Sequence, residues 1–85
     1  MDNIRVLLVD DEADFRRPIA KRLSRRGFEI HEAGDGEEAL DYLAANPIDV
    51  VVMDVKMPGL SGIDTMAHIK DRFDAIEVIL LTGHS

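Results

Sequence analysis

Three aspartates and a threonine stand directly after apolar runs of the chain. Asp10 and Asp11 follow residues 4–9, Asp54 follows residues 48–53, and Thr82 follows residues 76–81. An aspartate is already ionised at neutral pH, so it can act as a nucleophile without a general base. Two carboxylates about 4 Å apart repel by about 4 kcal/mol at an effective dielectric of 20, so a cluster of them needs a proton or a cation. Oxygen ligands without cysteine favour a hard ion such as Mg²⁺.

A plainer interpretation exists for each residue alone. A single aspartate after a strand is most often a turn former or a helix N-cap, and the Asp10-Asp11 pair has the right composition to cap a following helix. A threonine at a strand end fits its β propensity. Capping does not explain why the three aspartates and the threonine would all converge on one place. The choice between capping and a shared site therefore depends on the strands and helices that carry these residues.

The apolar runs predict four short strands, at residues 4–9, 28–33, 48–53 and 76–81. Helices are predicted between them. Phe15, Ile19 and Leu23 recur at a spacing of four within residues 14–26, and Gly27 is a typical helix end. The second predicted helix, residues 35–45, begins with the capping pair Asp35 and Glu38. A third helix follows the loop 57–62, with a packing face formed by Ile63, Met66, Ala67 and Ile69.

Strands that are apolar on both faces and alternate with helices predict an α/β fold, a doubly wound parallel sheet of order 2-1-3-4. In that order the first and third strands are neighbours at the switch point, where ligands bind beyond the carboxyl ends of the strands. We therefore expect Asp10, Asp11 and Asp54 to share one cleft, with Thr82 beside them.

Bulk properties limit the function further. With 85 residues the chain is one domain at most, and a net charge of −7 argues against nucleic-acid binding. No run of eighteen apolar residues and no signal peptide are present, and cysteine is absent. We expect a cytoplasmic protein without membrane contact.

The motifs together carry a family resemblance. Residues 7–12 (LLVDDE), 54–59 (DVKMPG), Gly62 and residues 80–83 (LLTG) resemble the receiver domain of two-component response regulators over the whole chain. The resemblance implies a flavodoxin-like sheet and a phosphorelay function, in which Asp54 accepts a phosphoryl group from a sensor histidine kinase. It also implies Mg²⁺ held by Asp11 and Asp54 directly, by Asp10 through water and by the backbone carbonyl of Lys56. Thr82 matches the switch residue that turns toward the phosphoryl group.

The match ends at Ser85, so residues 1–85 are expected to form a receiver domain that lacks the fifth strand and last helix. The lysine of that fifth strand is not among these residues. The fourth strand is then an apolar edge, and we expect self-association through it. An output domain is expected in the parent protein.

Two alternatives to phosphoacceptance remain. The first is a Mg²⁺-dependent aspartyl-phosphate phosphohydrolase. That class places an acid or base aspartate two residues after its nucleophile, and it is disfavoured because Lys56 and Glu12 stand two residues after Asp54 and Asp10. The second is a fragment that keeps the fold but is not phosphorylated. We expect a signalling domain rather than an enzyme, at most phosphorylating itself from small donors and dephosphorylating itself.

Overall fold

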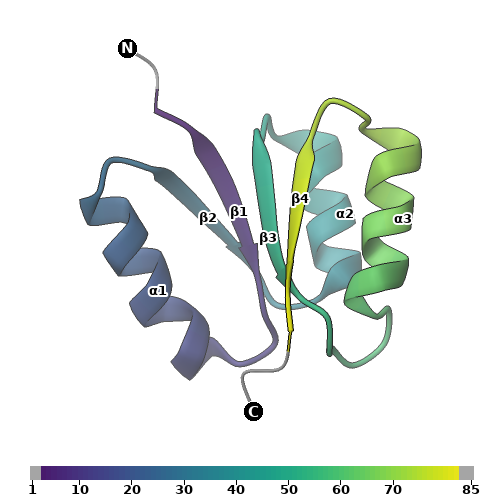
Figure 1. The fold of residues 1–85 in the computed structure, drawn as a ribbon, viewed down its shortest axis with the longest axis horizontal. Helices are drawn as coiled ribbons and strands as arrows, with labels where there is room; N and C mark the ends of the chain where they lie inside the picture. Colours follow the sequence, from purple (N-terminus) through teal and green to yellow (C-terminus); the bar gives the residue numbers. More distant parts are fainter. Residues whose placement is uncertain (1–2, 83–85) are drawn as a thin grey trace.

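The structure is a computed structural model, and it describes residues 3–82. Strands and helices alternate along the chain (Figure 1), in the order β1 (Arg5–Val9), α1 (Ala13–Arg25), β2 (Glu29–Ala33), α2 (Gly36–Ala45), β3 (Val50–Asp54), α3 (Gly62–Arg72) and β4 (Glu77–Leu81). The four strands form one sheet in the order β2-β1-β3-β4, and all neighbouring strands are parallel. The predicted α/β class and strand order 2-1-3-4 are confirmed.

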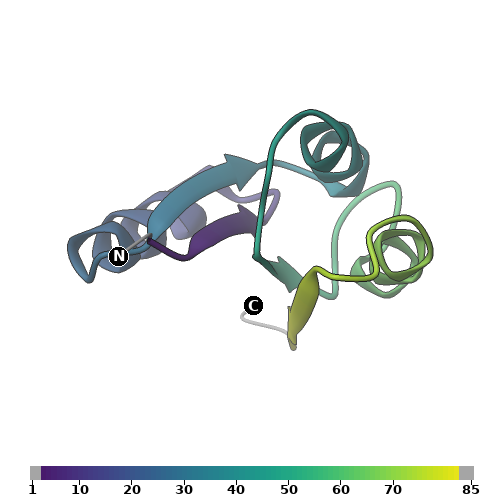
Figure 2. The same cartoon turned by 90° about the horizontal axis from the view of Figure 1, so that it is seen from above.

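The two faces of the sheet are covered unequally. Figure 2 shows α2 and α3 together over one face and α1 over the other. On the first face Leu7, Val51 and Met53 are fully buried and pack with Ile69 of α3 in the main core. On the second face Val50 and Val52 are only half-buried. The sheet is therefore sealed by two helices on one side and partly open on the side of α1.

The packing face of α3 differs from the prediction. Ile63 is exposed, as is Ala67, whereas Gly62, Thr65 and Ile69 are buried. The helix begins with Ser61 as N-cap, whose hydroxyl accepts a hydrogen bond from the Asp64 N–H at 3.1 Å. This start places Gly62 against the sheet, so positions three and seven residues later face inward. The prediction from hydrophobicity alone was therefore wrong for Ile63 and Ala67.

The other helices agree better with the sequence. The Asp35 carboxylate accepts the Glu38 N–H at 2.8 Å, and the Glu38 carboxylate accepts the Gly34 N–H at 2.9 Å, which confirms the capping pair. Pro18 lies inside α1, which begins at Ala13, one residue before the predicted start. Pro18 has no N–H to donate to the carbonyl of Asp14, so one hydrogen bond of the helix is not made there. Within residues 3–82, no helix has the length and apolar character needed to cross a membrane.

An ion pair closes the amino-terminal end of the sheet. The Asp49 carboxylate accepts hydrogen bonds from the Arg5 side chain at 3.1 and 3.2 Å and from the Arg5 backbone N–H at 2.8 Å. The Arg5 side chain first, and then its backbone N–H, lower the pKa of Asp49 below its usual 3.8. A lowered pKa in the folded state means that this stabilisation is complete above pH 3.8 and is lost as the pH falls through the folded value.

We therefore expect Asp49→Asn to lower the urea midpoint of unfolding at neutral pH, and the deficit to shrink as the pH falls below 3.8. Urea titrations at several pH values measure it. Asp71→Asn, at an exposed position of α3, is the matched control and should show no comparable pH-dependent difference. A deficit that grows on acidification would contradict the assignment.

Candidate functional site

The aspartates come together because the strands that carry them are paired. In the sheet Val9 of β1 lies opposite Met53 of β3, so Asp10 and Asp54 are the next residues on adjacent strands. Asp54 is itself the last residue of β3 and pairs with Leu81 of β4. Their side chains thus belong to the carboxyl-terminal edge of the sheet at the switch point, where open α/β sheets bind ligands.

Both aspartates are buried, which is unusual for a carboxylate. Asp10 is 3% exposed and Asp54 is 4% exposed. Each accepts a hydrogen bond from the backbone N–H two residues later, Asp10 from Glu12 at 2.9 Å and Asp54 from Lys56 at 3.1 Å. These turns orient the carboxylates. Two buried carboxylates on neighbouring strands raise the free energy of the fold unless positive charge compensates them.

A tight acidic group lies in the loop after β1. Carboxylate oxygens of Asp10, Asp11 and Glu12 lie within 4.8 Å of one another, and these residues are the one group with such spacing in the described part of the chain. Its membership differs from the predicted set, because Glu12 belongs to it and Asp54 does not. The Glu12 N–H that bonds back to Asp10 draws this loop together. The sequence did contain a signal for Glu12, because it is the third acidic residue in the run Asp10-Asp11-Glu12.

The donor set fits the Mg²⁺ that the sequence suggests. All candidate ligands are oxygens, two come from buried carboxylates, and two more carboxylates stand beside them at exposed positions. A small divalent cation prefers oxygen ligands and retains several waters, so an open edge of a sheet suits it. Asp10, Asp11 and Glu12 can offer such oxygens from one loop, and Asp54 stands at the end of the neighbouring strand.

The loop after Asp54 is shaped by glycines. Gly59 adopts a φ of 75°, which favours glycine over any other residue. Gly62 lies so close to β3 that a Cβ atom on it would stand 2.3 Å from the Asp54 carbonyl oxygen. The Gly62 N–H donates to the Val55 carbonyl at 2.9 Å and closes the loop. Gly59 therefore allows the turn, and Gly62 allows α3 to approach β3 closely.

The remaining predicted residues lie at the same edge. Thr82 is exposed and directly follows Leu81, the residue that pairs with Asp54. The Val55 N–H donates to the Leu81 carbonyl at 3.0 Å, which ties the two strand ends together. Lys56 contributes its backbone N–H to Asp54, while its side chain is exposed. Gly83 of the predicted motif lies outside the described residues.

Comparison with known proteins agrees with this geometry. The family model described as "Response regulator receiver domain" matches residues 6–85. The chain is 38% identical over 80 residues to the response regulator MprA of Mycobacterium sp. (strain KMS), and 35% identical over 81 residues to that of Mycobacterium tuberculosis (strain CDC 1551 / Oshkosh). These matches cover 94% and 95% of the chain but 35% of each relative, so the chain spans about a third of the relatives' length.

Solved structures show the same fold. A response regulator receiver protein from Pseudomonas putida superposes with a TM-score of 0.92 at 30% identity, over 100% of this chain and 72% of that one. The response regulator TrrA from Thermotoga maritima, solved in complex with Mg²⁺-BeF, gives a TM-score of 0.90 at 38% identity, over 96% of this chain and 71% of that one. This chain belongs to the family of response regulator receiver domains, which serve phosphorelay signalling in two-component systems.

Proposed function

We propose that Asp54 accepts a phosphoryl group from a sensor histidine kinase, at a site where Asp10, Asp11 and Asp54 hold Mg²⁺. The observation that carries this proposal is the position of Asp54, a carboxylate 4% exposed at the end of β3 beside the buried Asp10 of β1. It is supported by TrrA, which was solved both with Mg²⁺-BeF and with the histidine kinase ThkA.

Phosphoryl transfer to Asp54 requires that its carboxylate be held in a fixed orientation. A carboxylate oxygen of Asp54 forms a bond to phosphorus while the phosphorus–nitrogen bond of the phosphohistidine breaks, which leaves an acyl phosphate on the receiver. The Lys56 N–H holds one oxygen of Asp54 and so fixes the plane of the carboxylate. Mg²⁺, when bound, offsets the negative charge that the nucleophile and the phosphoryl group share. The backbone carbonyl of Lys56 completes the proposed ligand set.

Thr82 is the proposed switch residue. The phosphoryl group adds about −1.5 to −2 charge and three strong acceptors, which favour a nearby hydroxyl donor. Thr82 follows the strand residue that pairs with Asp54, so its backbone and the acceptor are linked through one rung of the sheet. Movement of Thr82 toward the phosphoryl group would alter the end of β4. In a longer parent protein, an output domain would read this change.

The direct test is incubation of the chain with Mg²⁺ and acetyl phosphate, followed by intact-protein mass spectrometry. We expect one added phosphoryl group per chain, and no addition when EDTA replaces Mg²⁺. The adduct should be released by neutral hydroxylamine, which cleaves an acyl phosphate and leaves a phosphoserine intact. Absence of any adduct with Mg²⁺ present would favour a domain that keeps the receiver fold without being phosphorylated.

The exposed face of β4 leads to a prediction about association. Ile79 is 50% exposed and Leu81 is 38% exposed on the edge strand of the described sheet. A groove of about 230 Å³ on the same face has an entirely apolar lining, formed by Ile4, Val6, Leu23, Phe28, Val50, Val52 and Ile79. Exposed apolar edge strands pair with other chains. We propose that a second copy of this chain covers this edge.

Light scattering at high protein concentration should give a mass above that of the monomer, and Ile79→Lys should lower it, because a lysine on an edge strand opposes pairing. Ile63→Lys is the matched control, since Ile63 is 55% exposed but lies on α3 and not on the edge strand. A monomeric mass for the unmodified chain would rule out the association.

A further inference from the structure

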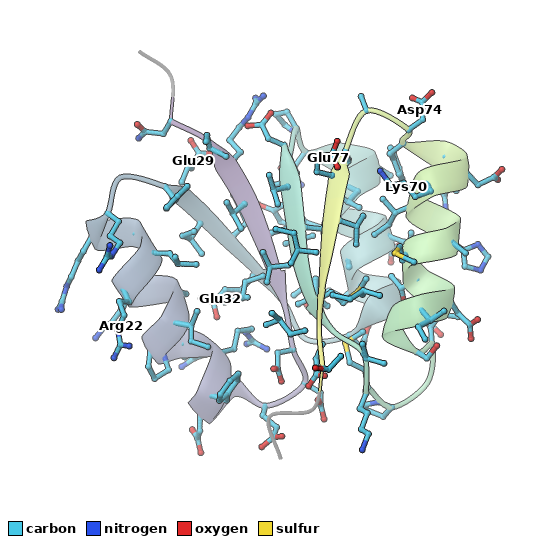
Figure 3. All side chains as sticks on the ribbon, in the orientation of Figure 1. Arg22, Glu29, Glu32, Lys70, Asp74 and Glu77 are labelled. Carbon is cyan, nitrogen blue, oxygen red and sulfur yellow. The ribbon has the colours of Figure 1, made fainter. Side chains whose placement is uncertain are left out.

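Arg16 of α1 connects the acidic loop to the neighbouring strand. Its Nε donates to the Glu32 carboxylate of β2 at 2.8 Å, and its Nη1 donates to the backbone carbonyl of Asp10 at 2.5 Å. Figure 3 shows Glu32 on the side of β2 that faces α1. The Arg16 side chain is only 13% exposed. One planar guanidinium therefore spans two elements, in a geometry that an arginine fork suits and a lysine ammonium does not.

The contact with the Asp10 carbonyl is one of several hydrogen bonds that hold the backbone of this loop. The Asp10 N–H donates to the Ala33 carbonyl of β2 at 3.2 Å, and the Asp10 carbonyl accepts from Arg16. The Arg16 backbone N–H donates to the Glu12 carbonyl at 2.9 Å, and the Glu12 N–H donates to the Asp10 carboxylate. Arg16 thus contacts both ends of the loop that carries Asp10, Asp11 and Glu12, through its side chain at one end and its backbone at the other.

We propose that Arg16 is a positioning residue for the cation site: with Glu32 it holds the loop of Asp10, Asp11 and Glu12 in the arrangement that binds Mg²⁺. The inference rests on the proposed function, since it assumes that Mg²⁺ binds here. It assigns Arg16 no contact with the ion. Arg16 acts through the backbone carbonyl of Asp10, and the Asp10 side chain is one of the two buried carboxylates of the site.

The positive charge of Arg16 and its proposed positioning role predict opposite changes in Mg²⁺ affinity when Arg16 is replaced. Arg16 brings a positive charge beside an acidic cluster, so electrostatics alone predicts that removing this charge strengthens cation binding. Loss of a residue that orients metal ligands weakens metal binding by about 10- to 100-fold. Arg16→Gln removes both the charge and the two-acceptor fork. The direction of the change in Mg²⁺ affinity therefore decides between the two roles.

The experiment is calorimetric titration of Mg²⁺ into the unmodified chain and its variants. We expect Arg16→Gln to weaken Mg²⁺ binding about tenfold or more. Arg17→Gln loses the same charge at an exposed neighbouring position of α1, and its affinity should be unchanged or slightly higher. Arg5→Gln breaks a second arginine–carboxylate pair, Arg5 with Asp49 at the opposite end of the sheet, and should leave Mg²⁺ affinity unchanged.

A second variant covers the case in which Arg16→Gln fails to fold. Arg16→Lys keeps the charge but has a single ammonium, which cannot reproduce the fork on Glu32 and the Asp10 carbonyl, so it too should weaken Mg²⁺ binding. Exchange of the Glu12 amide, measured by NMR without Mg²⁺, should be faster in either variant. Mg²⁺ affinity in Arg16→Lys and Arg16→Gln equal to or above that of the unmodified chain would overturn the proposal. If the unmodified chain binds no Mg²⁺, the proposed site itself is wrong.

Discussion

Replacement of Asp54 by asparagine is expected to abolish the phosphoryl adduct completely. Asparagine is nearly isosteric and can still accept the Lys56 N–H, so the turn at the end of β3 is retained. Its amide is neutral and is not a nucleophile toward phosphorus at neutral pH, so no acyl phosphate forms. Intact mass after incubation with Mg²⁺ and acetyl phosphate should show the unmodified mass only.

The same variant should respond less to Mg²⁺. A ligand that binds only the folded state stabilises it by about 2.7 kcal/mol at a concentration 100 times its dissociation constant. The unmodified chain should therefore unfold at a higher urea concentration when Mg²⁺ is present, and Asp54→Asn should lose much of this shift because one ligand is gone. Without Mg²⁺ we expect Asp54→Asn to be at least as stable as the unmodified chain, since it removes a buried charge.

Asp41→Asn is the control for both measurements. Asp41 is exposed on α2, so the substitution makes the same chemical change at a position outside the site. It should accept one phosphoryl group and respond to Mg²⁺ as the unmodified chain does. An adduct that persists in Asp54→Asn would place the acceptor elsewhere, and the acidic residues of the loop after β1 would then have to be tested one at a time.

Gly62→Ala is expected to be among the most destabilising single substitutions in the chain. The added Cβ would stand 2.3 Å from the Asp54 carbonyl oxygen and 2.8 Å from the Val55 Cα. Both are backbone atoms at the end of β3, so no side-chain rotation relieves the overlap. Overpacking of this kind costs about 1–3 kcal/mol, and we expect the upper end or more because the backbone must move. A small domain has only about 5–15 kcal/mol in total.

Gly34→Ala is its matched control. A Cβ on Gly34 would meet no atom closer than the Arg16 Nη1 at 3.8 Å, so this substitution should change stability by about 0.5 kcal/mol or less. Urea unfolding followed by circular dichroism compares the two. A variant Gly62→Ala that is as stable as Gly34→Ala would contradict the close approach of α3 to β3. If it folds, it should also accept phosphate more slowly, because the displaced atoms carry Asp54.

The order of elements and the strand order were predictable from the sequence. Strands that are apolar on both faces stand out in such a short chain, and they require helices on both sides of a parallel sheet. Capping signals were equally local: Asp35 and Glu38 bond as their spacing predicts. The packing face of α3 could not be predicted from local sequence signals. It depends on the approach of Gly62 to the Asp54 carbonyl, a contact between elements that periodicity does not contain.

For the site, the residue types and their order along the chain indicated the chemistry. Aspartates that end neighbouring strands of a parallel sheet must meet at one edge, so the sequence by itself determined that Asp10 and Asp54 lie side by side. It also predicted a hard cation or a phosphoryl group as the ligand. The tertiary structure decided which carboxylates cluster, since Glu12 joins Asp10 and Asp11 through a backbone hydrogen bond. It also decided that Arg16 and Glu32, sixteen residues apart, bridge α1 and β2 beside that cluster. Such contacts depend on the distance between elements, which is set by packing and not by the spacing of residues along the chain.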